Sequence, residues 1–235
     1  MGEMCCRGRF YRCFTGSGGV WVGWGSIVLG MRQIALGAST TVACVLLLLA
    51  CGPVVADGES ALPDCEWCGA TEAPEELSWQ SRIAPEGEEG EPLVVTGTVY
   101  EADGETPAAG VVIYAYHTDA EGIYRKEGGE TGNALRHGLL RGWVESDEDG
   151  RYRFDTIRPA SYPDSSIAQH VHMSVLPPGG EETWINSVKF TDDPLLTPSE
   201  RRQRPHRGGP GLVTPERDES GTWHAQRDIV LDFED

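Results

Sequence analysis

Short runs of apolar residues, many of them alternating with polar ones, recur from residue 93 to the end of the chain. Valine, isoleucine and aromatic residues dominate these runs, and segments rich in glycine and proline separate them, which is the pattern of β-strands joined by turns. Residues 143–157 predict a β-hairpin that turns at Asp149-Gly150, with Tyr152 and Phe154 on one face. The other predicted strands cover residues 93–100, 111–117, 170–175, 184–190 and 227–233. Short strands at this spacing predict an all-β fold, an antiparallel β-sandwich.

Helices contribute little to this prediction. The segment Thr197-Pro198-Ser199-Glu200 carries one convincing helix start, with a threonine N-cap, proline at the first helical position and glutamate at the third. The chain has 30 glycines and 15 prolines in 235 residues, so long helices are not expected. We therefore expect one or two short helices beside the sandwich, and we place this domain at residues 92–235.

The N-terminal part has the pattern of a targeting segment. Residues 31–50 begin with one positive charge and continue as an uncharged apolar run, which is the layout of a secretory signal. The run ends in Leu-Leu-Ala-Cys, which resembles the bacterial lipoprotein box, so Cys51 is the predicted lipidation site. An uncleaved membrane anchor over residues 34–55 is the alternative. The lipoprotein interpretation predicts an exported protein held by its lipid on a bacterial membrane, on the periplasmic or cell-surface side.

The segments on either side of this signal have simpler interpretations. Residues 1–30 precede a well-formed signal, and we interpret them as an extension or a mis-assigned start, with translation beginning at Met31. Residues 51–91 are rich in glycine, proline, glutamate and alanine, which predicts a flexible tether. The tether contains Cys65 and Cys68, and this pair predicts a local disulfide in an oxidising compartment. A redox pair or half of a metal site are the alternatives.

The net charge of the chain argues against nucleic acid as a partner. The formal net charge of −18 disfavours nucleic acid, because binding there depends on neutralising phosphates with lysine and arginine. The sequence leaves the oligomeric state open, and a homo-oligomer is one option.

Candidate chemistry gathers around residues 162–172. His170 and His172 are two apart in a predicted strand, so both side chains point to the same face and can reach one metal ion. Two histidines that are merely packed or solvated on that face are the alternative. Tyr162 stands eight residues earlier, and a phenolate is a hard anionic ligand that suits trivalent iron better than zinc. Two tyrosines with two histidines would therefore indicate Fe(III).

The second tyrosine is not chosen by spacing alone. Tyr114, Tyr116 and Tyr152 lie in strand patterns, where core packing is the usual reason for an aromatic residue. Tyr124 follows Gly122 in a predicted loop, where functional residues concentrate.

Longer motifs resemble a known family. "DAEGIY" (119–124), "LRGWVESDEDGRYRFDTIRPASYP" (140–163) and "HVHM" (170–173) resemble the intradiol ring-cleavage dioxygenases, the family of catechol and protocatechuate dioxygenases. The resemblance covers about residues 93–233 and implies a prealbumin-like β-sandwich. It also implies one non-haem Fe(III) per chain, with Tyr124, Tyr162, His170 and His172 as ligands.

The resemblance implies an oxidoreductase reaction as well. Members of the family bind a catechol-type aromatic and use O2 to cleave the bond between its two hydroxylated carbons, which yields a muconate-type diacid. The tyrosine that the substrate displaces corresponds to Tyr162, which can take a substrate proton and is the predicted catalytic residue.

Two positions depart from the family pattern. Ile167 stands where well-studied members have an arginine three residues before the first histidine, and Ser187 stands where they have a glutamine. Both replacements remove polar groups beside the ligands. They favour an alternative function, a non-catalytic cell-surface β-sandwich binding module that keeps the scaffold, with or without the iron. Thiol–disulfide chemistry at Cys65 and Cys68 is a third hypothesis, and it lacks the expected βαβ context.

The remaining histidines and two tryptophans receive structural interpretations. We expect His117, His137, His206 and His224 to lie on the surface. We expect Trp143 and Trp184 in the core or in the wall of a pocket.

Overall fold

The computed structural model describes residues 65–233, apart from 165 and 203–206. The predicted start at Met31, the signal at 31–50 and the lipidation site at Cys51 lie outside the described residues. Within the described residues, no helix is long and apolar enough to cross a bilayer.

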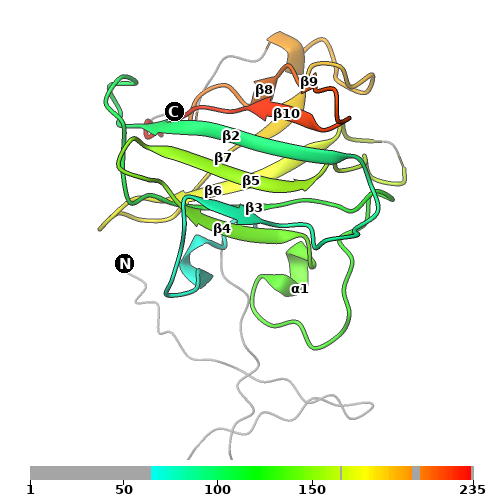
Figure 1. Cartoon of the computed structure of the whole chain (residues 1–235), viewed down its shortest axis with the longest axis horizontal. Coiled ribbons are helices and arrows are strands. Elements are labelled where there is room, and N and C mark those ends of the chain that lie inside the picture. The colour runs from blue at the N-terminus through cyan, green and yellow to red at the C-terminus, as the bar shows by residue number, and fades with distance from the viewer. Residues whose placement is uncertain (1–64, 165, 203–206, 234–235) are drawn as a thin grey trace, which may run out of the picture. The chain divides into compact units, whose positions relative to one another are not determined.

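Two mixed β-sheets form a sandwich (Figure 1). One sheet has the strand order β1-β5-β2-β10-β9, with β11 also paired to β2, and the other has the order β4-β3-β6-β7-β8. The strands are β1 (Gln80–Arg82), β2 (Pro92–Tyr100), β3 (Val112–Tyr116), β4 (Arg141–Glu145), β5 (Arg151–Ile157), β6 (His170–Leu176), β7 (Thr183–Phe190), β8 (Leu212–Val213), β9 (Glu216–Arg217), β10 (Trp223–Gln226) and β11 (Ile229–Val230).

The all-β sandwich is confirmed, and the antiparallel expectation needs one refinement. The long central pairs β2–β5, β3–β4, β3–β6 and β6–β7 are antiparallel. The short strands β1, β8, β10 and β11 are each parallel to a longer neighbour. Only the short stretch Ile229–Val230 of the strand predicted at 227–233 pairs in a sheet.

The predicted hairpin over residues 143–157 is wrong. Its two strands, β4 and β5, exist, but they belong to different sheets. Strand β5 pairs with β2 from Pro92↔Ile157 to Thr98↔Arg151, while β4 pairs with β3. The turn at Gly150 therefore passes the chain from one sheet to the other, because the alternation of apolar residues sets which face is buried and not which strand is the neighbour.

The predicted helix start is present, and the element that follows it is described as far as Arg202. The Thr197 hydroxyl accepts a hydrogen bond from the Glu200 N–H at 3.2 Å, and Glu200 accepts one from the Thr197 N–H at 2.9 Å, which is the capping box. The described part of this element is the single 3₁₀ turn η2 (Glu200–Arg202). A helix that we did not expect, α1 (Ala134–His137), lies between β3 and β4 in the chain.

The predicted tether at 51–91 is wrong for the part that the structure describes. Residues 65–91 contain the 3₁₀ turn η1 (Ala70–Glu72) and the strand β1, which pairs with β5. Ile83 and Ala84 are buried in the core. Their apolar side chains hold the segment on the sandwich, so the domain begins well before residue 92.

Two apolar clusters lie on the two faces of the five-stranded sheet. Its inner face packs against the other sheet in the main core, to which β3 contributes Ile113 and Ala115. The intervening residues Tyr114 and Tyr116 belong to a second cluster with Trp143 and Tyr124. The alternation of side chains along β3 thus places an aromatic layer on the outer face of this sheet, and the candidate site lies on that face.

Candidate metal centre

Strand β6 supplies the two histidines. His172 is the register partner of Tyr116 on β3, and His170 and His172 point to the same outer face of the sheet. Their Nε2 atoms lie 3.0 Å apart. His170 is buried and His172 is half-buried, while Val171 between them points into the core.

The other ring nitrogen of each histidine is held in place. Nδ1 of His170 donates a hydrogen bond to the carbonyl oxygen of Ala168 at 2.8 Å, which leaves Nε2 without the proton. Nδ1 of His172 lies 3.2 Å from the hydroxyl oxygen of Ser187 on β7. Hydrogen bonds of this kind fix the orientation of a metal-binding imidazole and direct its free nitrogen.

Tyr124 is positioned by a compact loop after β3. The side chain of Asp119 accepts hydrogen bonds from the N–H groups of Glu121 and Ile123, each at 3.0 Å. Gly122 adopts φ +83°, and a Cβ atom there would meet the backbone of Ser161. The loop thus requires glycine two residues before Tyr124, both for its conformation and for close packing against the next loop.

That next loop carries Tyr162. The N–H of Ala160 donates to the carbonyl oxygen of Asp119 at 3.1 Å, which ties the two loops together. The phenol oxygen of Tyr162 consequently lies 3.1 Å from that of Tyr124 and 3.4 Å from Nε2 of His170. Two loops and one strand therefore bring all four predicted ligands together.

Three separations among the four donor atoms are in the range that one metal ion requires. Donor atoms about 2.1 Å from an ion, at angles of about 90–110°, lie about 3.0–3.4 Å from one another. The successive separations along Tyr124, Tyr162, His170 and His172 are 3.1, 3.4 and 3.0 Å. Within the described part of the chain, no group of three or more histidine, cysteine, aspartate or glutamate side chains could hold a metal. A metal at this site therefore depends on the two phenols.

The electrostatics of the site favour a strongly charged cation. Burial lowers the pKa of His172 well below its usual value, and the neighbouring His170 lowers it further. Burial raises the pKa of the Tyr124 phenol, and so does its hydrogen bond with Tyr162. The imidazoles are thus neutral and able to bind metal, whereas the buried phenol needs a bound cation to lose its proton.

The other candidate tyrosines have different neighbours. The Tyr114 hydroxyl lies 2.8 Å from Nδ1 of His137, and the Tyr152 hydroxyl donates to the carbonyl oxygen of Arg227 at 2.5 Å. Tyr116 stacks on His172, with ring centroids 4.7 Å apart. The geometry therefore selects Tyr124 as the partner of Tyr162.

Two histidines expected on the surface are buried. His117 donates from Nδ1 to the Thr118 carbonyl at 2.7 Å and accepts at Nε2 from the Thr156 hydroxyl at 2.6 Å. His137 donates from Nε2 to the carbonyl oxygen of Glu66 at 2.7 Å. His117 ends a predicted strand and His137 lies in a polar segment, and residues distant along the chain, Thr156 and Glu66, bond to them.

The expectation for His224 is confirmed, because its side chain is 47% exposed. His206 lies outside the described residues. Trp143 joins the outer aromatic cluster and Trp184 lines a cavity, as expected.

Two cavities open beside the candidate ligands. The smaller, about 100 Å³, is lined by Tyr124, Tyr162 and His172, with Trp67 and Arg136 also in its wall. The larger, about 350 Å³, shares Trp67 and His172 with it and extends past Ser187.

Sequence reasoning did not single out Trp67 or Arg136, although the cysteines flanking Glu66-Trp67 marked a constrained loop. The structure joins these cysteines, Cys65 and Cys68, in a disulfide.

The two departures from the family pattern have different surroundings. Ile167 is 40% exposed in the loop before β6. Ser187 contacts His172 and lines the larger cavity, so this short side chain keeps a polar contact with a candidate ligand.

Comparison with known proteins gives a consistent picture. Residues 70–203 match a protein-family model described as a dioxygenase. The 6-chlorohydroxyquinol 1,2-dioxygenase of Cupriavidus pinatubonensis is 34% identical over 128 residues, 47% of this chain and 44% of that protein. Catechol 1,2-dioxygenase 1 of Acinetobacter lwoffii is 40% identical over 80 residues, 34% of this chain and 24% of that protein.

A third relative is the protocatechuate 3,4-dioxygenase beta chain of Burkholderia cepacia. It is 30% identical over 113 residues, which are 46% of this chain and 48% of that protein. The chain therefore spans less than half the length of each of these three curated relatives.

Solved structures share the fold. The dioxygenase domain of a dioxygenase–carbohydrate-binding protein fusion from Streptomyces sp. SirexAA-E aligns with a TM-score of 0.51 at 21% identity, covering 68% of this chain and 92% of that one. Catechol 1,2-dioxygenase from Pseudomonas arvilla C-1 aligns with a TM-score of 0.50 at 17% identity, covering 67% of this chain and 57% of that one. The family match extends over more than half of the sequence, and on this basis the chain belongs to the intradiol ring-cleavage dioxygenase family.

Proposed function

We propose that this protein is a ferric-iron-dependent intradiol dioxygenase that opens the ring of a catechol-type aromatic between its two hydroxylated carbons. Both atoms of O2 enter the product, a muconate-type diacid, so the reaction needs no external reductant. Family membership supports the reaction class. The observation that carries the proposal is the convergence of two phenols and two imidazoles, with donor separations of 3.1, 3.4 and 3.0 Å.

We assign the metal-binding role to Tyr124, Tyr162, His170 and His172, with one ion per chain. Ferric iron held by these residues would supply a Lewis acid that binds a catechol and makes its ring reactive toward O2. The hydrogen bonds of Ala168 and Ser187 keep the two imidazoles oriented.

Tyr162 has a second role in proton transfer. Its phenol lines the small cavity, within 3.4 Å of both Tyr124 and His170. A phenolate at this position can accept a proton from a substrate hydroxyl as the catechol enters. Tyr124 is positioned by the Asp119 loop, and we assign it metal binding alone.

Ferric loading of the purified protein tests this assignment. Tyrosinate bound to Fe(III) absorbs visible light, so the loaded protein should be wine-red, and catechol should shift the band while O2 is consumed. Tyr162→Phe should shift or weaken the band, whereas Tyr114→Phe, which removes a buried phenol bonded to His137, should leave it unchanged. A protein that stays colourless after loading would disprove the iron assignment.

The second candidate is a non-catalytic binding module that keeps the iron. The exposed apolar side chain of Ile167, at the position where an arginine was expected, favours it. A coloured protein whose band shifts with catechol, but which consumes no O2 and forms no ring-opened product, would support this second function.

The location of the protein is a separate proposal. We propose export and lipid attachment at Cys51, supported by the apolar run at 31–50 and its Leu-Leu-Ala-Cys ending. Expression with a radiolabelled fatty acid in a bacterial host should label the protein, and Cys51→Ser should abolish the label. Labelling that survives this substitution would contradict the proposal.

A further inference from the structure

A four-residue loop closed by the Cys65–Cys68 disulfide stands beside the candidate metal centre. The carbonyl oxygen of Glu66 accepts a hydrogen bond from Nε2 of His137 at 2.7 Å. Just after the loop, the carbonyl oxygen of Gly69 accepts one from Nε1 of Trp143 at 2.7 Å. These contacts attach the loop to the aromatic layer on the outer face of the five-stranded sheet.

The carboxylate of Glu182 holds the same segment from another side. It accepts hydrogen bonds from the N–H groups of Gly69 and Ala70, each at 2.6 Å, and from the hydroxyl of Ser174 on β6, also at 2.6 Å. Bonds to a charged acceptor are among the stronger ones in proteins. The loop therefore has a fixed position relative to the strand that carries His170 and His172.

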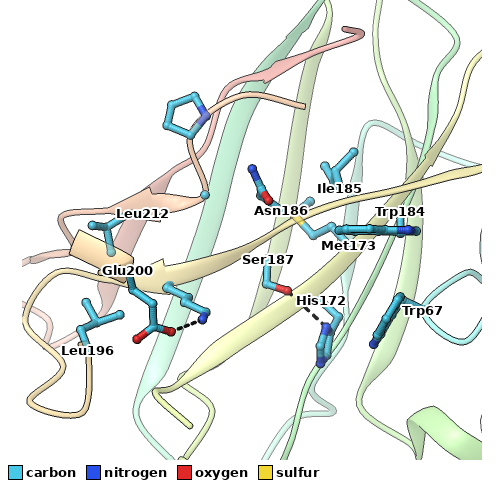
Figure 2. Close-up of a pocket in the computed structure, with 13 residues that line it drawn as sticks. Trp67, His172, Met173, Trp184, Ile185, Asn186, Ser187, Leu196, Glu200 and Leu212 are labelled. Carbon is cyan, nitrogen blue, oxygen red and sulfur yellow. Dashed lines mark hydrogen bonds and ion pairs between the residues drawn. The ribbon is translucent and has the colours of Figure 1, made fainter. Parts of the chain in front are cut away.

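This loop directs a tryptophan to the junction of the two cavities. Trp67 is 41% exposed, and both it and His172 line the small and the large cavity. Figure 2 shows Trp67 beside His172, with Trp184 nearby. The ring centroids of Trp67 and Trp184 are 5.3 Å apart, and their planes are inclined by 60°.

Apolar side chains line the larger cavity from the two rings to its far end (Figure 2), and the Arg207 guanidinium lies over the Trp184 ring, 4.1 Å from its centroid. Met173, Ile185, Leu196 and Leu212 contribute to its lining. Lys189 and Glu200 also line it, but Nζ of Lys189 lies 2.5 Å from the Glu200 carboxylate, so these charges neutralise one another. A cavity of about 350 Å³ of this character is suited to an uncharged apolar group.

We propose that Trp67 and Trp184 select catechols that carry an aromatic substituent on the ring. The inference rests on the proposed function, since it places the two catechol oxygens in the small cavity beside Tyr162 and His172. The substituent then lies in the larger cavity against the two indole rings, one of which comes from the disulfide loop. A single unsubstituted catechol ring would leave the larger cavity to water, whereas a second ring buries apolar surface and makes face or edge contacts with the indoles.

Binding measurements test the proposal without requiring turnover. Isothermal titration calorimetry would compare catechol with 4-phenylcatechol on the wild-type protein and on Trp67→Ala, Trp184→Ala and Trp79→Ala. Trp79 is the matched control, because it is 40% exposed and does not line either cavity. The wild type and Trp79→Ala should bind 4-phenylcatechol about tenfold more tightly than catechol, the scale of one buried aromatic contact.

The preference should fall to about twofold in Trp67→Ala and in Trp184→Ala, and in Trp184→Ala, whose side chain does not line the small cavity, the affinity for catechol itself should change little. Circular dichroism checks that the variants are folded, and the two cavity variants give independent readings. Equal affinities for the two ligands in the wild type, or a preference retained in both cavity variants, would overturn the inference. So would failure of the wild type to bind 4-phenylcatechol.

Failure of the proposed function is recognised separately. The visible band after ferric loading and the uptake of O2 would be recorded on the same samples. A wild-type protein with the band and O2 uptake but no preference contradicts the substrate inference alone. A protein without either signal that still prefers 4-phenylcatechol, and loses the preference in Trp67→Ala, contradicts the catalytic proposal and supports the cavity assignment.

Discussion

Tyr116 stacks on His172, with ring centroids 4.7 Å apart and ring planes inclined by 20°. The two residues are register partners on β3 and β6. Tyr116 also stacks on the buried His137, with centroids 3.6 Å apart and planes inclined by 9°. The flat ring of Tyr116 restricts rotation of the His172 imidazole. Tyr116 therefore orients a candidate ligand and is not itself one of the four candidate ligands.

Replacing Tyr116 with leucine should weaken iron binding by about 10–100-fold, because the His172 ring loses the surface that orients it. Tyr116→Phe keeps the ring and should bind iron within about twofold of the wild type. Competition with a chelator, followed by the visible band, measures both. If the phenylalanine variant loses as much affinity as the leucine variant, the hydroxyl and not the stacking is responsible.

Ser187→Ala should lower iron affinity by about tenfold, because Nδ1 of His172 loses its partner at 3.2 Å. Ser187→Thr retains a hydroxyl and should restore most of the affinity. Ser220→Ala is the control, because the Ser220 hydroxyl bonds to the exposed Asp218, away from the site. Unchanged affinity in Ser187→Ala would show that the Ser187 contact does not orient the ligand.

Gly69→Ala should reduce the free energy of unfolding by about 1–3 kcal/mol, the usual cost of inserting a methyl group into a packed site. A Cβ atom at Gly69 would lie 2.7 Å from Cδ1 and Cζ of Tyr114, a fully buried ring whose hydroxyl is bonded to His137. At Gly180 the added Cβ would meet its nearest atom at 3.4 Å. Urea unfolding should therefore leave Gly180→Ala within about 0.5 kcal/mol of the wild type, and an equal loss in both variants would contradict the steric argument.

His117 should make the folded protein less stable as the pH falls from about 6.5 to about 4. Complete burial lowers the pKa of His117 to about 4. In this range the unfolded chain binds a proton at His117 that the folded protein does not, so stability decreases with falling pH and levels off below the folded pKa. The full contribution is about 3 kcal/mol.

The difference between wild type and His117→Gln isolates this contribution from the carboxylates that titrate in the same range. Denaturant unfolding at several pH values should show a difference in unfolding free energy that changes between pH 6.5 and 4 and is constant above pH 7.5. A difference that does not vary with pH would mean that His117 is not the group responsible.

Local sequence patterns predicted several elements correctly, because each of these elements depends on residues only a few positions apart. The strands at 93–100 and 170–175 follow from the apolar residues and the period of two, which also places His170 and His172 on one face. The capping box at Thr197 and Glu200 depends on two residues three apart. The same period of two did not reveal that β4 and β5 lie in different sheets, because it specifies a face and not a partner.

By itself the sequence determined the longer strands, the faces they bury and the pair of histidines on β6. Residue spacing did not decide which tyrosine stands beside Tyr162, and only the family resemblance implied Tyr124. In the tertiary structure Tyr124, 38 residues away, reaches Tyr162 through two loops joined by the Asp119–Ala160 hydrogen bond. The same applies to Trp67, whose loop lies over a face built from strands much later in the chain. Side-chain periodicity acts over neighbouring residues, whereas the site is made by contacts between distant segments that form only when the sandwich closes.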